Sequence, residues 1–393
     1  MEVRREGLLM GELRRRTLAI FSAQYLPHMG GVENFTKELS SALERMGVHA
    51  IVVTSAYGDA PEHEVDTAGL EVFRLPSSQL LDGRLPVVRD GEATRALLGE
   101  VAKAKPDGVF VNTRLYGLSL MGVRFARNLG ITPVVLDHGS SYIGFGVPVL
   151  DSVVHAYEKA ITRKIRSYSP KFYGVSEKSA EWLRTFGIIA DGVIHNAIEA
   201  EEFRKQASHR DFRAELGIGP DVLLVCFVGR IANGKGIEVV TELARRFERR
   251  GKRIHFAIAG DGPDFKALKQ HAPEYASVLG RLGRPDVAAL FGQSDLHILP
   301  SKSEGLPTSL LEASAEGTPS LVFDVGGARE VIPSDSYGIV LDDQSTTVCE
   351  EVLDWYLDNR DVLKEQGANV RKRVEHVFSW EETAHKTIEA CGV

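Results

Sequence analysis

The sequence has few cysteines, no long apolar run and no excess of positive charge. Its three cysteines, Cys226, Cys349 and Cys391, lie far apart. They have no metal-ligand spacing, and their odd number argues against a disulfide framework, so a reducing cytoplasm fits best. No apolar stretch approaches the roughly 20 residues of a membrane-spanning helix. A net charge of -7 provides no global basic field, so nucleic acid is not an expected partner.

The first 16 residues read MEVRREGLLMGELRRR. They are charged, and their apolar run covers only Leu8–Met10, which is too short for the apolar core of a signal peptide. We therefore expect a cytoplasmic protein in which residues 1–16 form a frayed extension, because chain termini tend to fray.

The length of the chain predicts more than one domain. Its 393 residues exceed one typical core, so two domains of about 150 to 200 residues are expected. A hydrophobic fraction of 43% and a charged fraction of 26% are ordinary for a globular protein.

Short apolar runs alternate with helix-period segments in the first half of the chain. The expected strands are Leu18–Ala23, His49–Thr54, Glu71–Leu75, Gly108–Val111, Pro133–Leu136 and Phe172–Val175. The expected helices include Val32–Met46, Gly117–Leu129 and a helix around Glu177–Phe186 that Ser176 caps. Such alternation predicts parallel strands joined by crossover helices.

A second alternation follows a polar, charged connection at Ile198–Pro220. Its expected strands are Val222–Val228, Ile254–Ala259, Leu296–Leu299 and Pro319–Phe323, and its helices are Gly236–Arg250, Asp264–Ala272, Pro285–Gln293 and Thr308–Glu316. The prediction is an α/β chain of two doubly wound domains with a cleft between them, where ligands bind at the carboxyl ends of the strands. The domain boundaries are an extension (1–16), a first domain (17–198), a connection (199–220), a second domain (221–375) and a final segment (376–393).

The clearest chemical motif is the run Glu304–Glu312. The strand before it leads through Pro300-Ser301 into a loop, and Pro307 suits the first turn of the next helix. Free backbone N–H groups near Thr308 and Ser309 can hold an anion, and the two carboxylates can each bind a pair of sugar hydroxyls. Taken alone, the two glutamates also fit a solvated helix start.

This run resembles the signature of retaining glycosyltransferases of family 4, and the resemblance extends over roughly residues 18 to 390. The matching segments of the second half are Gly229-Arg230, Lys235-Gly236, Ala259–Pro263, Pro300-Ser301, Glu304–Ala313, Gly326-Gly327 and Glu330. Those of the first half are Gly30–Glu33, His138, Val175-Ser176 and Ile194–Asn196.

The resemblance implies a GT-B architecture, in which two Rossmann-like domains face a central cleft. The first would bind the acceptor and the second the donor, and the segment 376–393 would cross back to the first domain. The implied reaction moves a hexosyl unit, with retention, from a UDP- or GDP-linked sugar to a glycan, lipid-linked or small-molecule acceptor. No cofactor and no metal are implied.

The resemblance also implies roles for single residues. Arg230 and Lys235 would neutralise the leaving diphosphate in place of a metal, and the chain has no Asp-x-Asp pair. His138 would contact the transferred sugar, Glu304 its 3- and 4-hydroxyls, and Glu312 the ribose. The further expected substrate-binding residues are Gly30, Gly31, Asn196, Gly260, Gly262, Leu306, Thr308 and Ser309.

Two positions depart from the family pattern. Asn196-Ala197-Ile198-Glu199 stands where Asn-Gly-Ile-Asp is usual, and Ala197 disfavours a left-handed turn by about 1 kcal/mol relative to Gly. Leu306-Pro307 stands where Phe-Gly is common, and Pro307 has no backbone N–H to donate.

Two other functions remain open on the sequence. A sugar-nucleotide 2-epimerase of the same architecture would turn over without an acceptor, and a non-catalytic nucleotide-sugar-binding protein would be expected to have lost Arg230, Lys235 or Glu312. For the transferase we favour same-face attack assisted by the leaving phosphate, because no carboxylate is placed as a nucleophile.

The last hypothesis concerns a peripheral contact with the inner face of a membrane. Residues 156–166 predict a helix on which Lys159, Arg163 and Arg166 share a face, with an apolar side formed by Ala160, Ile161 and Ile165. A second basic cluster comprises Arg4, Arg5, Arg14, Arg15 and Arg16. The alternative is a solvated helix face and a disordered tail.

Overall fold

The computed structural model describes residues 14–28, 30–66, 69–80, 85–142, 144 and 148–393. Most of the expected N-terminal extension and its Arg4 and Arg5 lie outside these ranges. The chain divides into two compact units, one of residues 1–112, 116–134 and 388–393 and the other of residues 113–115 and 135–387. Each unit is described by itself.

The first unit is built on parallel strands whose cores are fully buried. They are β1 (Thr17–Ser22), β2 (His49–Ser55), β4 (Glu71–Leu75) and β7 (Gly108–Asn112), with the antiparallel β3 (His63–Val65) at one edge and the order β7-β1-β2-β4-β3. Leu18 pairs with Ala50 on one side and Gly108 on the other. A Cβ at Gly108 would meet the side chains of Val393, Leu18 and Cys391, so a larger residue there would require these side chains to shift.

Helices α1 (Gly31–Arg45), α2 (Glu92–Lys103) and α3 (Gly117–Asn128) follow these strands, and β5 (Ser77–Leu80) pairs with β6 (Leu85–Val88). Two basic residues near the start of the described chain are tied to this fold. Arg14 forms an ion pair with Asp107 (3.2 Å) and Arg15 with Glu44 (2.7 Å). These two are therefore not part of a free basic tail, because opposite charges within the unit hold them.

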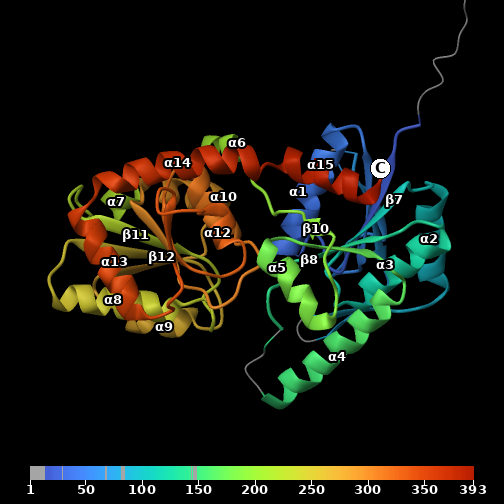
Figure 1. The fold of residues 1–393 in the computed structure, drawn as a ribbon, viewed down its shortest axis with the longest axis horizontal. Helices are drawn as coiled ribbons and strands as arrows, with labels where there is room; N and C mark the ends of the chain where they lie inside the picture. The colour runs from blue at the N-terminus through green and yellow to red at the C-terminus, as the bar shows by residue number, and fades with distance from the viewer. Residues whose placement is uncertain (1–13, 29, 67–68, 81–84, 143, 145–147) are drawn as a thin grey trace, which may run out of the picture. The chain divides into compact units, whose positions relative to one another are not determined.

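The second unit begins with β8 (Val134–Asp137), α4 (Pro148–Arg166), β9 (Lys171–Gly174), α5 (Glu177–Trp182), a 3-10 turn (Leu183–Phe186) and β10 (Gly192–Val193). Ser176 caps α5, because its Oγ accepts from Ser179 N, as the sequence predicts. Helix α4 extends away from the strands around it (Figure 1).

The rest of this unit surrounds a parallel sheet of six strands. They are β11 (Leu223–Val228), β12 (Ile254–Ala259), β13 (Ala276–Gly280), β14 (Leu296–Leu299), β15 (Ser320–Phe323) and β16 (Gly338–Leu341). Their order, β13-β12-β11-β14-β15-β16, is that of a doubly wound Rossmann sheet, whose strand order reverses between β11 and β14. In the first unit, the parallel strands in the order β4-β2-β1-β7 correspond to β13-β12-β11-β14 of this sheet. The predicted α/β class is therefore confirmed.

The helices of this part are α6 (Ala200–Lys205), α7 (Phe212–Glu215), α8 (Ile237–Arg249), α9 (Phe265–His271), α10 (Arg284–Gln293), α11 (Thr308–Glu316), α12 (Ala328–Val331), α13 (Thr346–Asp358) and α14 (Asp361–Val377). Helix α15 (Trp380–Cys391) follows, and its residues from Ile388 onward belong to the first unit. The expected connection thus contains two short helices, α6 and α7. Phe203 and Phe212 are fully buried, so this polar segment is anchored by one aromatic side chain in each helix.

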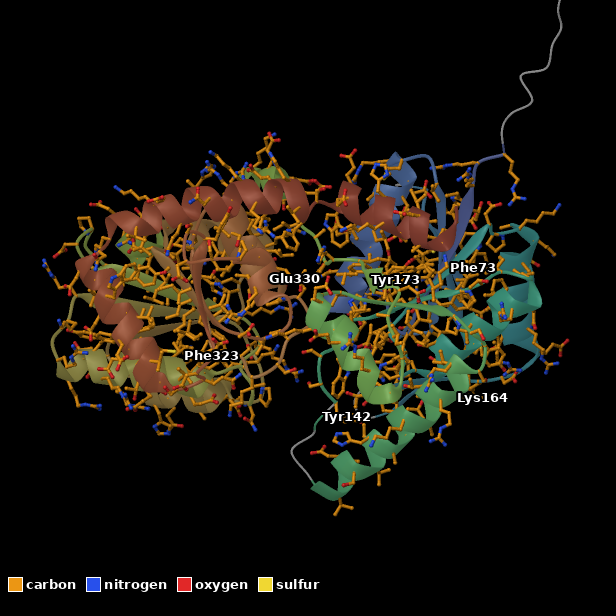
Figure 2. All side chains as sticks on the ribbon, viewed as in Figure 1. Phe73, Tyr142, Lys164, Tyr173, Phe323 and Glu330 are labelled. Atoms are coloured by element: carbon orange, nitrogen blue, oxygen red, sulfur yellow. The ribbon has the colours of Figure 1, made fainter. Side chains whose placement is uncertain are left out.

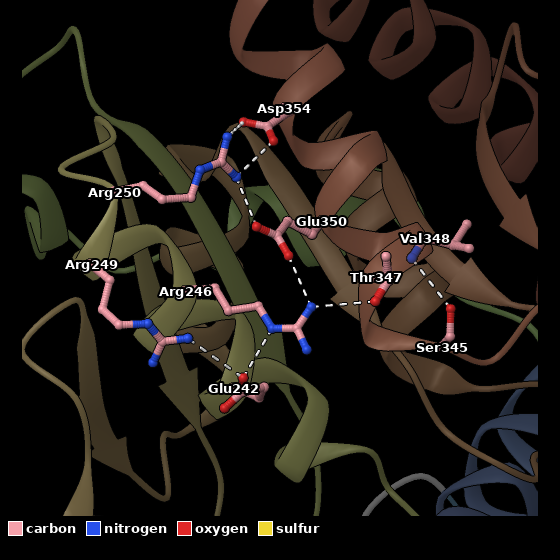
Figure 3. Close-up of polar contacts among 9 residues, drawn as sticks. All are labelled: Glu242, Arg246, Arg249, Arg250, Ser345, Thr347, Val348, Glu350 and Asp354. Carbon is pink, nitrogen blue, oxygen red and sulfur yellow. Dashed lines mark hydrogen bonds and ion pairs between the residues drawn. The ribbon is translucent and has the colours of Figure 1, made fainter.

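An ion-pair network ties α8 to α13 (Figure 3). Arg246 contacts Glu242 and Glu350, each at 2.9 Å, and Arg250 contacts Glu350 and Asp354, each at 2.8 Å. Glu350 joins the two arginines, so the helix after β11 is fixed to the helix after β16.

Candidate functional site

The loops after β11 and β14 touch at the carboxyl ends of the two central strands. Gly236 begins the turn into α8 with a φ of 79°, and a Cβ there would overlap the Pro300 carbonyl. Lys302 N also donates to Gly234 O at 2.9 Å. Glycine at position 236 therefore allows the loop that carries the predicted cations to pack against the loop that carries Glu304.

Within this contact, Lys235 Nζ lies 2.7 Å from Glu304 Oε1. The lysine side chain is one-third exposed and that of Glu304 is 14% exposed. Arg230, the other predicted cation, is exposed, and its side chain makes no hydrogen bond or ion pair within the described ranges. The structure thus joins Lys235 to Glu304 and leaves Arg230 at the surface.

The second Gly-rich turn packs against the first through its backbone. Ile231 N donates to Asp261 O at 2.9 Å, and Gly229 N donates to Ala259 O at 3.1 Å. A Cβ at Gly260 would overlap the Gly229 carbonyl, and one at Gly262 would overlap that of Ile231. These two glycines, expected to bind substrate, also have a packing function that requires them.

The turn after β8 carries His138. Burial lowers the pKa of its imidazole to about 3, so the ring is neutral at neutral pH. Its backbone carbonyl lies where a Cβ on Gly305 would be, and Ser141 Oγ lies 2.7 Å from Ser303 Oγ. Ser140 Oγ also hydrogen bonds to Glu304 O. Within the second unit, His138 is therefore next to the Glu304 loop.

Helix α11 carries two predicted parts of the site, which are the backbone N–H groups of its first turn and the carboxylate of Glu312. Pro307 precedes it without a side-chain cap, Thr308 is exposed and Ser309 is half-buried. Glu312 lies on the second turn, and burial raises the pKa of its carboxyl from 4.5 to about 7, while Arg284 partly opposes the rise. The side chain is half-buried, and its carboxylate oxygens are acceptors that suit hydroxyl groups.

The remaining predicted residues of this unit lie beside α11. Asn196 Nδ2 donates to the carbonyl of the buried Leu306 at 3.4 Å. His195 Nε2 lies 2.7 Å from Glu330 Oε2, and Glu330 Oε1 accepts from Glu177 N at 2.9 Å. Figure 2 labels this glutamate. The side chain of Asn196 therefore supports this loop by binding the backbone carbonyl of Leu306.

In the first unit, Gly30 and Gly31 form the N-terminus of α1. A Cβ at Gly30 would overlap the Glu33 carboxylate, whereas one at Gly31 would meet no atom within 4 Å. Glu33 is buried and lies 3.2 Å from His28 Nδ1. The open space at Gly31 leaves room for a ligand group to approach the backbone. At Gly30, glycine is instead favoured by packing against the Glu33 side chain.

One cluster near His138 escaped the sequence-based prediction. Arg114 Nε lies 3.1 Å from Asp137 Oδ2, and its Nη2 lies 2.6 Å from Glu158 Oε1, with all three side chains at most 4% exposed. Thr113, just before it, has a φ of 65°, a strained value for a β-branched residue that costs on the order of 1–3 kcal/mol. The only sequence signal is an arginine just past a buried strand.

Known families match both halves of the chain. The family described as Glycosyltransferase Family 4 matches residues 29–202, and that described as Glycosyl transferases group 1 matches residues 208–373. The chain belongs to the family 4 type of glycosyltransferases. The resemblance seen in its motifs is thereby confirmed, and the protein is an enzyme of this class.

Two curated relatives extend over most of the glycosyltransferase. A GDP-mannose-dependent alpha-mannosyltransferase of Corynebacterium glutamicum is 25% identical, over 88% of this chain and 82% of the relative. The gpi3 subunit of the Schizosaccharomyces pombe phosphatidylinositol N-acetylglucosaminyltransferase is also 25% identical, over 92% of this chain and 77% of the relative.

Solved structures show the same fold. Sucrose-phosphate synthase from Thermosynechococcus elongatus superposes with a TM-score of 0.74, at 19% identity, over 95% of this chain and 98% of that one. WaaG, a glycosyltransferase of lipopolysaccharide biosynthesis, gives a TM-score of 0.68 at 18% identity, over 96% of this chain and 100% of that one. The glycosyltransferase therefore has two Rossmann-like α/β domains of the GT-B type. Among its described helices, none is long and apolar enough to cross a bilayer.

Proposed function

We propose that the enzyme transfers a hexosyl unit from a UDP- or GDP-linked sugar, with retention and without a metal. The observation that carries the proposal is the ion pair of Lys235 with Glu304, 2.7 Å apart, at the carboxyl ends of β11 and β14. Ligands of doubly wound sheets bind where the strand order reverses, which is between these two strands. Residues 221–375 are the proposed donor domain and residues 17–198 the proposed acceptor domain.

The donor site follows from the charges around this pair. A diphosphate brings negative charge that competes with Glu304 for Lys235, and the exposed Arg230 supplies a second cation. The first turn of α11 offers the N–H groups of Thr308 and Ser309 to a phosphate oxygen. Glu312, half-buried on the second turn of α11, accepts the two ribose hydroxyls through its carboxylate oxygens.

The proposed reaction is a same-face substitution. The bond from the anomeric carbon to the diphosphate oxygen breaks, and its electron pair stays on the diphosphate next to Lys235 and Arg230. The acceptor oxygen bonds to the anomeric carbon on the same face and gives its proton to the departing phosphate. Preorganised cations stabilise this charge as it develops. His138, being neutral, contributes a hydrogen bond to the sugar rather than a charge.

Helix α4 is the proposed contact with a membrane that carries a lipid-linked acceptor. The apolar side predicted for it is wrong in part, because Ile161 and Ile165 are 8% and 0% exposed and pack into the protein. The exposed apolar residues are instead Val149 (77%), Val153 (62%) and Tyr157 (41%). They recur every four residues and therefore share one face.

The charges of α4 complement an anionic surface. Arg163 and Lys164 are exposed in its last turn, whereas Asp151 and Glu158 are not exposed. At 100° per residue, these two acids fall on the side opposite Val149 and Val153. Arg166 is held within the fold by Phe186 O at 2.7 Å. The outward face of α4 therefore carries apolar residues and cations and, among its described side chains, no carboxylate. Such a face suits the headgroup boundary of an anionic bilayer, and we place this contact at the cytoplasmic side of the membrane.

The test is an anomer-resolved NMR assay with UDP-glucose, UDP-N-acetylglucosamine and GDP-mannose, each with and without candidate acceptors. We expect one donor to give product of retained configuration. An inverted product would overturn the retaining mechanism, and a 2-epimer formed from the donor alone would identify an epimerase. Donor binding without any turnover would identify a binding protein.

A further inference from the structure

The buried cluster of Arg114, Asp137 and Glu158 lies beside the His138 turn and outside the proposed donor site. Because its side chains are at most 4% exposed, none of them is accessible to a soluble substrate. Any influence of this cluster on the reaction must therefore pass through the residues that it contacts.

On one side, the cluster fixes the turn that contains His138. The backbone N–H of Gly139 donates to the Asp137 carboxylate, which closes a short turn around His138, as Asp side chains commonly do. The backbone carbonyl of Asp137 also accepts from Val175 N at 3.0 Å. Both the side chain and the main chain of Asp137 are thus held, and the orientation of the next residue depends on them.

On the other side, the cluster is attached to α4. Arg114 Nη1 lies 3.1 Å from Thr162 Oγ1, one helical turn beyond Glu158, and its guanidinium carbon lies 3.7 Å from the centre of the Phe186 ring. Arg114 therefore joins helix α4 to the end of β8. The guanidinium uses its planar fork for this purpose, which a lysine ammonium cannot reproduce.

Stability alone does not explain these charges. Two carboxylates face one guanidinium, and Glu158 Oε2 is buried without a hydrogen-bond partner in the described part of the chain. Buried ion groups of this kind are often replaced by apolar side chains without loss of stability. Strained residues such as Thr113, next to Arg114, tend to occur at functional sites.

We propose that Arg114, Asp137 and Glu158 are positioning residues, which hold His138 in the orientation that meets the transferred sugar and tie that turn to helix α4. The inference rests on the proposed function, in which His138 contacts the sugar. It adds a set of residues that act on the reaction without touching the substrate.

The first experiment compares Arg114→Lys and Glu158→Gln with the matched control Arg213→Lys. Arg213 is also held by a carboxylate, Asp295 at 2.6 Å, but it lies at the opposite, amino ends of the strands. Release of UDP or GDP is measured from the three donors named above. We expect kcat to fall about 10- to 100-fold, as for other misplaced catalytic groups, with an unchanged KM, and no change in the control.

A second readout does not depend on turnover. The imidazole NMR signal of His138, assigned by its loss in His138→Gln, should shift in Arg114→Lys and Glu158→Gln and stay in place in Arg213→Lys. If Arg114→Lys does not fold, Glu158→Gln decides alone, because its amide oxygen still accepts from Arg114. An unmoved His138 signal with wild-type kcat would overturn the positioning role, whereas a wild-type enzyme inactive on all donors would count against the proposed function instead.

Discussion

Glu312 and Glu316 lie one turn apart on α11, and burial raises the pKa of both carboxyls from 4.5 to about 7. Only Glu312 is a proposed ligand of the donor. Glu316 therefore provides a matched control for Glu312, since both lie on α11 and burial raises the pKa of both carboxyls to about 7.

The first prediction concerns stability. A carboxyl whose pKa is raised by folding binds more protons in the folded state, so stability should fall as pH rises from 4.5 to 7. Glu312→Gln and Glu316→Gln should each raise the Tm relative to wild type at pH 8, and the gain should vanish near pH 4. Thermal unfolding across this range checks it. A gain that grows toward acid would contradict the assignment.

The same pair separates stability from binding. Donor binding should favour the ionised form of Glu312, so the affinity for the nucleoside diphosphate should drop as pH falls below about 7. Glu312→Gln should bind weakly with a flat pH profile, and Glu316→Gln should bind like wild type. Calorimetric titration with UDP and GDP measures both. Equal loss in the two variants would point to a general effect on α11.

The cations of the donor site give a second kind of prediction. Arg230→Ala and Lys235→Ala should each reduce turnover by two or more orders of magnitude, since a preorganised charge contact contributes about 3 to 4 kcal/mol. Lys302→Ala is the control, because Lys302 pairs with Glu238 at 3.5 Å and is 60% exposed. Near-normal rates in the two site variants would remove these cations from the mechanism.

Metal removal should have little effect on the rate. Lys235 and Arg230 supply positive charge at the proposed diphosphate site, so an EDTA-treated enzyme should keep most of its turnover. Initial rates before and after chelation, with Mg²⁺ and Mn²⁺ added back, test this expectation. Complete loss of activity that Mn²⁺ restores would be the contrary result.

Helix α4 should bind anionic vesicles in a salt-sensitive way. Cations near such a surface contribute roughly 1 kcal/mol each, and the apolar residues add to this. Flotation with phosphatidylserine-containing vesicles should be lost in Val149→Asp/Val153→Asp and weakened in Arg163→Glu/Lys164→Glu. Ile189→Asp, at an 86% exposed apolar position elsewhere, should float like wild type. No flotation of the wild-type protein at any salt concentration would favour a soluble acceptor.

The sequence predicted most of the sheet elements, because their signals are local. The strand Leu296–Leu299 and the helix Thr308–Glu316 were found with the predicted bounds, since a buried apolar run, a proline and a glycine delimit them. It also placed Lys235 and Glu304 in loops that each follow a predicted strand. The contact of 2.7 Å between them follows from the strand order.

What the sequence missed depends on contacts between distant residues. Periodicity defined an apolar side of α4 but not whether it meets the protein, so Ile161 and Ile165 were counted toward a membrane contact although both are buried. Arg114 meets partners 23 and 44 positions away, which no local pattern reveals.

The interlocked backbones of the loops after β11 and β12 constrain how this enzyme can be re-engineered. Because the carbonyls of Gly229 and Ile231 occupy the space of side chains at Gly260 and Gly262, the two loops form one structural piece. A chimera that takes residues 229–236 from a relative with another donor preference should keep its fold only if residues 259–263 come from the same relative. Donor specificity in this enzyme would then be inherited by paired segments rather than by single substitutions.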